Sequence, residues 1–379
     1  MRVLHLTDHY PPALGGIETH VRSLSQRQAA RGDDVTVLTS SPGPGGSHED
    51  GTDGRVRVLR ASSLRAGLAV DVTAFDVVHA HVSVVAPFTS PWTAVAARRG
   101  VPTLVTVHSL WNGMGPVPGA AAALSGLRSA PVLWTAVSQV AARHVAVRVP
   151  RDAEVQVLPN AVDVVARPQT PGPRPDGSVH LVSTMRLARR KRPLPLVRMF
   201  RDLQRSVRRP LRLTVVGDGP QLERVAREVE ACGLEGAVTL TGRVTPAQVP
   251  QLLAGADLYV APAILESFGL AALEARCVGL PVVGHSASGL TEFVRPGVEG
   301  LLGRTDDDIV DLLRELVLDD AFRHNISEHN RQVPSTMTWA HSLRHHDAAY
   351  ELACARARRP RGMVPLLAAG WSGRPGERA

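Results

Sequence analysis

The chain has 379 residues, of which 44% are hydrophobic, and its formal net charge is +8 at pH 7. This length favours two or three compact domains with apolar cores, so a wholly disordered protein is excluded. Six arginines and one glutamate lie in segment 355–379, so this end carries much of the positive charge. Only three tyrosines are present to stack on single-stranded bases, and we expect no nucleic-acid partner.

Other features concern the cellular compartment. The first residues, MRVLHLTDHYPP, lack the apolar core of a signal peptide, and no uninterrupted apolar run reaches the ~18 residues of a membrane span. The three cysteines have neither disulfide-framework nor metal-ligand spacing, which favours a reducing compartment. We expect a cytoplasmic protein.

The first half of the chain has the alternating pattern of parallel strands and helices. Strands are expected at 3–7, 35–39, 56–59, 76–80, 103–107, 136–138 and 155–159, and a helix over 19–31. Segment 41–54, rich in glycine, is expected to be a flexible loop. Gly15 and Gly16 follow the carboxyl end of the first strand, which is where open parallel sheets bind ligands.

Three histidines lie in or after the buried strands of this half. His79 and His81 could ligate a metal, but no third ligand is evident in the sequence, so we expect no metal site. His108 follows strand 103–107 at the ligand-binding edge. It is either a ligand-contacting residue or simply a histidine that ends a strand.

Segment 166–177 is dense in proline and glycine and predicts a linker between two α/β halves. Strands are expected at 179–183, 211–216, 238–241, 258–260 and 281–283, with helices ending near 207, over 270–278, from 306 onward and over 339–358. Gly217 begins a tight turn, because the third glycine of a dinucleotide fingerprint is missing. Asp306–Asp308 precede an apolar helical pattern and are interpreted as helix-start residues, not as a metal site.

The helix over 270–278 has a start suited to a phosphate. The amides of Ser267, Phe268, Gly269 and Leu270 would be unpaired at the positive end of its dipole. Glu266 and Glu274 frame this start, and carboxylates suit the paired hydroxyls of a sugar or ribose. The alternative is that both glutamates are merely solvated.

The stretches ESFGLAALEA, GLPVV and GLTEFV, together with GGIExH near the amino terminus, resemble the retaining glycosyltransferases of family 4. The resemblance covers about residues 1–355. It implies the GT-B fold, in which two doubly wound Rossmann-like domains face a central cleft. It also implies transfer of a hexosyl-type sugar from a UDP or GDP sugar to an acceptor hydroxyl, with retained configuration and neither metal nor cofactor.

The resemblance also implies roles for those residues that match the family's motifs. Glu266 would contact the transferred sugar and Glu274 the ribose, while His108 would lie beside the sugar. Arg186 and Lys191 match two basic positions of the family loop GRLxxxKG, and would neutralise the charge that develops on the diphosphate. The other donor-binding residues are Gly15, Gly16, Gly217, Arg243, Val244, Ser267, Phe268, Gly269 and Leu270, and the acceptor-side candidates are His9, Glu18, His81, Ser138 and Asn160.

The sequence departs from the family pattern in two loops. Met185 and Arg192 replace the two glycines of GRLxxxKG, and Ala161 replaces the glycine of PNGVD. The alternative for the basic loop is therefore a solvated turn whose arginines and lysine have no ligand.

The expected domains are 1–167 on the acceptor side, a linker at 168–177, a nucleotide-sugar domain at 178–337, a helix over 338–358 that crosses back, and a disordered tail at 359–379. Segment 119–134 contains a single arginine, whereas lipid acceptors usually call for a basic amphipathic helix. This favours a small soluble acceptor of secondary metabolism over membrane association.

Several alternatives stay open. They are a phospholipid or cell-envelope glycosyltransferase, a sugar-nucleotide epimerase of the same fold, a non-catalytic sugar-nucleotide-binding protein and a nucleic-acid binder. The oligomeric state is not predicted.

Overall fold

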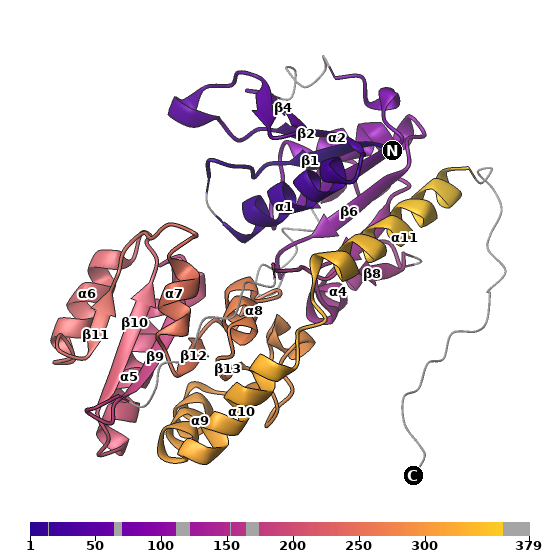
Figure 1. Cartoon of the computed structure of the whole chain (residues 1–379). Coiled ribbons are helices and arrows are strands. Elements are labelled where there is room, and N and C mark those ends of the chain that lie inside the picture. The colour runs from indigo at the N-terminus through magenta and orange to yellow at the C-terminus, as the bar shows by residue number, and fades with distance from the viewer. Residues whose placement is uncertain (14, 64–69, 111–121, 152, 164–173, 359–379) are drawn as a thin grey trace, which may run out of the picture.

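The strands form two separate sheets, each flanked by helices, as the computed structural model shows (Figure 1). The structure describes residues 1–13, 15–63, 70–110, 122–151, 153–163 and 174–358. Most of the predicted linker and the tail at 359–379 lie outside these residues. The domain boundaries therefore stay predictions.

The first sheet has the order β3-β4-β2-β1-β5-β6-β7-β8. Its strands are β1 (Arg2–Thr7), β2 (Asp34–Thr39), β3 (Gly51–Asp53), β4 (Val56–Arg60), β5 (Val77–Val82), β6 (Thr103–Val107), β7 (Leu133–Ala136) and β8 (Val155–Val157). All neighbours are parallel except β3 and β4. The side chains of β5 are all buried, as expected for a central parallel strand.

Two predictions for this half were wrong. Segment 41–54 is not a simple loop, because it contains a 3-10 turn, η1 (Pro44–Gly46), and strand β3. The carboxylate of Asp53 accepts hydrogen bonds from Tyr10 and Arg22, which holds β3 against the sheet. The strand expected at 136–138 lies earlier, at β7, because the Ser138 side chain caps the next helix.

The helices of this half are α1 (Gly16–Ala30), α2 (Thr89–Arg98) and α4 (Gln139–Ala146), with a further 3-10 turn, η3 (Val72–Ala74). Helix α1 begins three residues earlier than predicted, directly after Gly15. The Gly15-Gly16 pair therefore lies at a helix start, at the end of the connection that follows β1.

The second sheet has the order β11-β10-β9-β12-β13-β14, with parallel pairing throughout. Its strands are β9 (Val179–Thr184), β10 (Leu211–Val216), β11 (Val238–Leu240), β12 (Leu258–Ala261), β13 (Val282–His285) and β14 (Gly300–Gly303). Strand β14 was not predicted. In chain order this arrangement is 3-2-1-4-5-6, the Rossmann order, which binds ligands at the carboxyl ends of its strands.

Helices of the second half flank this sheet. They are α5 (Pro193–Ser206), α6 (Leu222–Ala231), α7 (Val249–Ala254), α8 (Leu270–Cys277), α9 (Asp306–Leu318) and α10 (Asp320–Gln332), with 3-10 turns η4 (Arg189–Lys191) and η5 (Gly289–Glu292). Asp306–Asp308 form the first turn of α9, as predicted. Thr305 caps this helix, and Asp308 completes a capping box.

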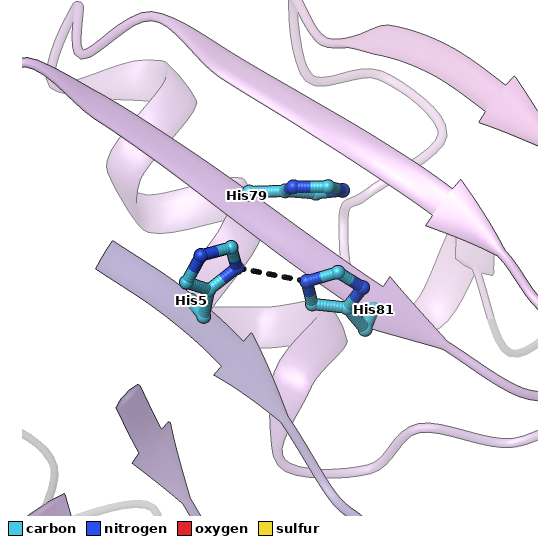
Figure 2. Close-up of side chains that lie close together, drawn as sticks. All are labelled: His5, His79 and His81. Atoms are coloured by element: carbon cyan, nitrogen blue, oxygen red, sulfur yellow. Dashed lines mark hydrogen bonds between the residues drawn. The ribbon is translucent and has the colours of Figure 1, made fainter. Parts of the chain in front are cut away.

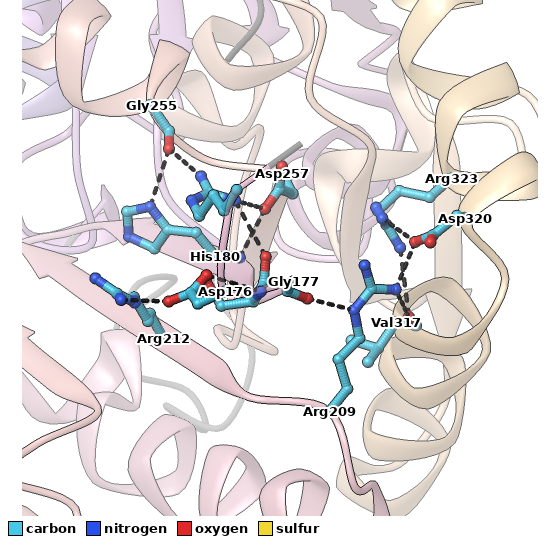
Figure 3. A network of polar contacts seen from close by, with 12 residues as sticks. Asp176, Gly177, His180, Arg209, Arg212, Gly255, Asp257, Val317, Asp320 and Arg323 are labelled. Atoms are coloured by element: carbon cyan, nitrogen blue, oxygen red, sulfur yellow. Dashed lines mark hydrogen bonds and ion pairs between the residues drawn. The ribbon is translucent and has the colours of Figure 1, made fainter. Parts of the chain in front are cut away.

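A polar network fastens the amino ends of the second sheet (Figure 3). The carboxylate of Asp257, just before β12, accepts the backbone N–H of His180 in β9 at 2.7 Å. Arg209, before β10, donates to the Val317 carbonyl at the end of α9 and to Asp320 at the start of α10. These contacts lie at the edge opposite the ligand-binding edge, which indicates a structural role.

The last described helix, α11 (Trp339–Ala357), leaves the second half and lies along the first sheet (Figure 1). Its start is tied to the end of the first half, where the Val162 N–H donates to the Met337 carbonyl. Tyr350 of α11 is fully buried. In the described part of the chain, no helix combines the length and apolar character that a membrane span requires.

Candidate active site

The two halves of the chain contact one another at the start of helix α8. The Ser267 hydroxyl donates to the backbone carbonyl of His108 at 2.6 Å. On the same side, the Glu292 carboxylate accepts the Gln139 N–H at 2.6 Å. Because His108 follows β6 and Ser267 follows β12, the carboxyl ends of both sheets face one another here.

The start of α8 depends on two glycines. Gly269 has φ of 95°, and a Cβ there would lie 2.7 Å from Leu290 Cδ2. A Cβ at Gly289 would lie 2.3 Å from the Ser267 carbonyl oxygen, and the Gly289 N–H donates to the Glu266 carbonyl at 2.8 Å. Turn η5 therefore fixes the position of the 266–268 loop. The backbone amides that follow this loop form the start of α8 and face the first half of the chain.

Glu266 and Lys191 form an ion pair, with Nζ and Oε2 2.5 Å apart. Lys191 ends turn η4, and its side chain is 39% exposed, so an incoming anion has access to it. Arg186 is exposed, and its guanidinium has no hydrogen bond or ion pair among the described residues. The structure thus brings Lys191, but not Arg186, into contact with Glu266.

Arg192 differs from the other basic residues of this loop. Its φ of 58° is the one left-handed value of a residue other than glycine in the described part of the chain. Its guanidinium donates two hydrogen bonds of 2.7 Å to Asp306 and one of 3.1 Å to the Pro262 carbonyl. The alternative of a solvated turn is therefore wrong for Arg192, whereas Arg189 and Arg190 are exposed.

Glu274 lies on α8, half-buried, and its carboxylate has no hydrogen bond among the described residues. Burial raises the pKa of Glu274 to about 7. Burial also raises the pKa of Tyr259, with the nearby Glu274 and Glu266 charges adding to the shift. A carboxylate held in this way would gain hydrogen bonds from a ligand that brings hydroxyl donors.

The glycine turn after β10 packs against the basic loop. Gly217 has φ of 131°, and a Cβ there would lie 2.0 Å from the Met185 carbonyl oxygen. The Gly217 N–H also donates to the Gly242 carbonyl at 3.1 Å, which places the exposed Arg243 and the half-buried Val244 beside this turn.

The acceptor-side candidates separate into two groups. His9 and Glu18 come together, with Nδ1 and Oε1 3.8 Å apart, and a Cβ at Gly15 would lie 2.3 Å from the Glu18 carboxylate. In contrast, Ser138 and Asn160 are buried, and the Ser138 hydroxyl accepts the Ala141 N–H as a helix cap.

His81, the remaining acceptor-side candidate, is fully buried. Burial leaves His81 no surface that an acceptor could contact in this structure, and its place among the acceptor-side residues stays a prediction. The structure also supplies the third histidine that was not evident in the sequence, because His5 of β1 lies beside His79 and His81 (Figure 2). One ring nitrogen of each lies within 4.8 Å of the others.

Hydrogen bonds, however, occupy these rings. His5 Nδ1 and His81 Nε2 are 2.9 Å apart, and His79 bonds to the hydroxyls of Tyr350 and Thr106. Burial lowers the pKa of His5 to about 4, so the ring is neutral at pH 7. A second group of ring nitrogens, from His20, His81 and His108, also lies within 4.8 Å.

Sequence reasoning missed several residues around His108. The ring of His20, the histidine of the GGIExH stretch, lies 5.2 Å from the His108 ring between centroids, and it stacks on Trp339 with 5.5 Å between centroids. Its place in the motif was a usable signal. Gln28 and Tyr350 gave none, because they are 322 positions apart and meet only through the crossing of α11.

Two Rossmann-like sheets whose carboxyl ends face one another at a helix start form the GT-B fold. Residues 14–166 match the description "Glycosyltransferase Family 4", and residues 170–333 match "Glycosyl transferases group 1". The chain belongs to glycosyltransferase family 4, and it is an enzyme of the transferase class.

Three known proteins illustrate the relationship. The D-inositol 3-phosphate glycosyltransferase of Nocardioides sp. is 30% identical, over 91% of this chain and 86% of its own length. The 2-deoxystreptamine N-acetyl-D-glucosaminyltransferase of Streptomyces fradiae is 32% identical, over 80% and 84% respectively. The structure of Anabaena HepE in complex with UDP-glucose superposes with a TM-score of 0.71 at 18% identity, covering 94% of this chain and all of the other.

Proposed function

We propose that this glycosyltransferase moves a hexosyl-type sugar from a nucleoside-diphosphate sugar to a hydroxyl of a small soluble acceptor, with retained configuration and without a metal or cofactor. The observation that carries the proposal is the group formed by Glu266, Lys191 and the start of α8. Glu274, whose carboxylate has no hydrogen bond within the described part of the chain, lies one helix turn beyond. A positive helix end and an ammonium suit a diphosphate, and the carboxylates suit sugar hydroxyls.

In the proposed donor complex, the diphosphate lies at the start of α8 and the ribose hydroxyls donate to Glu274. Lys191 would exchange part of its contact with Glu266 for the phosphate oxygens, and Arg186, exposed and without a partner among the described residues, would add a second cation. Released from Lys191, the Glu266 carboxylate would orient the sugar hydroxyls. Charge on the leaving phosphate would then be stabilised as the glycosidic bond breaks.

The proposed chemical step is an internal return. The bond from the anomeric carbon to the phosphate oxygen breaks, and the acceptor oxygen forms a bond to the same face of that carbon. The acceptor proton passes to the departing phosphate oxygen, so the products are the glycoside and the nucleoside diphosphate. No side chain is required as a covalent nucleophile.

For the acceptor, we propose a small polyhydroxylated ring. Two relatives, 30% and 32% identical over at least 80% of this chain, are named for inositol phosphate and 2-deoxystreptamine, both of which carry hydroxyl groups on a cyclohexane ring. On the acceptor side of this chain, His9 and Glu18 lie together beside Gly15 and offer a hydrogen-bonding pair for hydroxyls. The HepE complex makes UDP the first nucleotide to test, with GDP second.

Calorimetry with UDP and GDP tests the donor site. Replacing Glu274 with alanine removes charge-assisted hydrogen bonds of ~1.5–3 kcal/mol, so nucleotide affinity should fall by about one to two decades. Glu266→Ala is the matched control, because it should slow transfer while leaving nucleotide affinity nearly unchanged. Equal nucleotide affinity in wild type and Glu274→Ala, with matching melting curves, would contradict the ribose assignment.

A further inference from the structure

A continuous hydrogen-bonded chain connects a backbone carbonyl in β6 to the ring of His108. Starting at the Val105 carbonyl, it passes through Thr135, Thr106, His79, Tyr350, Gln28, His5 and His81 to His108. All its distances lie between 2.6 and 3.0 Å. Every side chain in it is buried. Figure 2 shows the His5–His81 bond of this chain.

The Val105 carbonyl fixes the direction of the first bonds, because a carbonyl oxygen only accepts. Thr135 donates its single hydroxyl proton to Val105, at 3.0 Å. The 2.6 Å bond between Thr135 and Thr106 must then use the proton of Thr106. Since that proton is spent, the Thr106 oxygen accepts from Nε2–H of His79, at 2.7 Å.

The same reasoning continues through the next two groups. Neutral His79 carries one ring proton, so its Nδ1 accepts from the Tyr350 hydroxyl, at 3.0 Å. The Tyr350 oxygen then accepts from the amide nitrogen of Gln28, at 2.9 Å. This orients the Gln28 side chain, and its carbonyl oxygen faces His5.

The last three groups are histidines. Gln28 Oε1 accepts from Nε2–H of His5, at 2.7 Å, so His5 Nδ1 accepts from Nε2–H of His81, at 2.9 Å. His81 Nδ1 in turn accepts from Nε2–H of His108, at 3.0 Å. Burial keeps these rings neutral at pH 7, because it lowers the pKa of His5 to about 4 and that of His108 to about 3.

The directions of these hydrogen bonds therefore determine which ring nitrogen of His108 carries the proton. His108 has its proton on Nε2, and among the described residues its Nδ1 takes part in no hydrogen bond. Every ring nitrogen of His5, His79 and His81 either donates or accepts within the chain. A metal bound by these three rings would have to replace hydrogen bonds of this network, so the proximity of the rings does not by itself indicate a metal site.

We propose that the Val105 carbonyl, acting through Thr135 and the buried chain, holds His108 in the tautomer with its proton on Nε2. In this tautomer His108 offers Nδ1 as an acceptor to a hydroxyl of the bound sugar. Thr135, Gln28 and the buried histidines are positioning residues, because they act only through His108. The tautomer follows from the chain itself, and its use on a sugar rests on the proposed function.

Thr135→Val tests the anchor, because it removes the hydroxyl that fixes the direction. The Thr106 proton can then turn to His79, the Gln28 amide can turn over, and the whole chain can run in reverse with the His108 proton on Nδ1. Thr135→Ser is the matched control, because it keeps the hydroxyl. Neither substitution touches a residue of the proposed catalytic group.

Nitrogen NMR of histidine-labelled protein at pH 7.5, without substrate, measures the tautomer. The spectrum of His108→Asn identifies the His108 signals. In wild type and Thr135→Ser we expect a protonated Nε2 and an unprotonated Nδ1, and in Thr135→Val a mixture or reversal. A protonated Nδ1 in wild type, or a Thr135→Val spectrum unchanged from wild type in a folded protein, would overturn the proposal.

Activity gives an independent readout. If both directions of the chain are similar in energy, about half of the Thr135→Val molecules lose the competent tautomer, and kcat/KM for the donor should fall about twofold or more. Thr135→Ser should restore the wild-type value. Full activity of a Thr135→Val protein with reversed His108 would contradict the use of Nδ1. Absence of transfer by wild type would instead contradict the proposed function and leave the tautomer result valid.

Discussion

Arg192 adopts a backbone conformation that glycine prefers, at a position where the family loop has glycine. The left-handed conformation costs a residue with a Cβ about 1–2 kcal/mol. The bidentate contact with Asp306 and the bond to the Pro262 carbonyl offset this cost. Arg192 thus keeps the backbone conformation of the family's glycine, and its ion pair with Asp306 compensates for the strain that glycine would not have.

Two substitutions separate these contributions. Arg192→Ala loses the ion pair and keeps the strain, whereas Arg192→Gly loses the ion pair but relieves the strain. We expect both to lower the free energy of unfolding, with the alanine variant lower by about 1 kcal/mol. Urea denaturation measures the difference. A glycine variant less stable than the alanine variant would contradict the strain at this position.

Lys191 is expected to act mainly on the transition state. Charge accumulates on the phosphate as the bond to the sugar breaks, so Lys191→Ala should lower kcat by about 10²–10³ and change the donor KM less. Arg189→Ala and Arg190→Ala are matched controls, because both arginines are exposed in the same turn. Steady-state kinetics in which either control is as damaging as Lys191→Ala would refute the role of Lys191.

At the scale of single residues, sequence motifs identified part of the candidate site. They did not identify residues that come together only in the tertiary structure. Glu266 was expected beside the transferred sugar and Lys191 beside the diphosphate of the same donor, and the two side chains form an ion pair. The buried chain behind His108 was not predictable, because α1, β1, β5 and α11 each contribute one or two of its side chains. The ion pair of Arg192 was not predictable either, because its partner, Asp306, is 114 positions away.

At the scale of elements, the start of α8 is the part of the site most sensitive to shape. Gly269→Ala would place a Cβ 2.7 Å from Leu290 Cδ2, in a backbone conformation with φ of 95°. We expect a loss of nucleotide affinity larger than the loss of stability, because the 267–270 amides shift relative to the phosphate. Calorimetry and melting curves compare the two, with Gly279→Ala, at the other end of α8, as control.

Gly279 also has a left-handed conformation, with φ of 100°, and a Cβ there would meet the flexible Arg331 side chain. Its substitution therefore carries similar backbone strain without touching the helix start. Equal loss of nucleotide affinity in both variants would show that general strain, and not the position of the amides, determines binding.

Strong periodic elements were predictable from the sequence, and elements fixed by tertiary contacts were not. Strands β6 and β10 were predicted with their observed bounds, 103–107 and 211–216. The continuous apolar run around β7 did not show where its strand begins and ends. Strand β3 has the sequence GTD, which lacks residues of high strand propensity, and it forms through pairing with β4.

At the scale of the whole molecule, the buried histidines should make the fold sensitive to acid. Histidines in the unfolded chain bind protons near pH 6.5, whereas burial lowers the pKa of His5 and His346 to about 4 and that of His108 to about 3. The unfolded state therefore binds more protons than the folded state below pH 6.5. For each unit that the pH falls between the unfolded and the folded pKa, each such histidine lowers the free energy of unfolding by about 1.4 kcal/mol.

The raised pKa of Glu274, about 7, acts in the opposite direction, since its folded form takes up a proton first. The histidines outnumber it, so we expect the free energy of unfolding to fall steeply between pH 6.5 and 5. Urea titrations at several pH values measure this. Constant stability over that interval would contradict neutral burial of the histidines.

We propose retaining, metal-independent sugar transfer at the place where the carboxyl ends of the two sheets face one another. NMR of the product formed from an α-linked UDP or GDP sugar and a cyclitol acceptor, with enzyme treated with EDTA, tests it directly. We predict an α-linked glycoside, formed at the same rate before and after EDTA treatment, and none from Lys191→Ala at comparable times. A β-linked product, or activity that returns only with Mn²⁺ or Mg²⁺, would contradict the account.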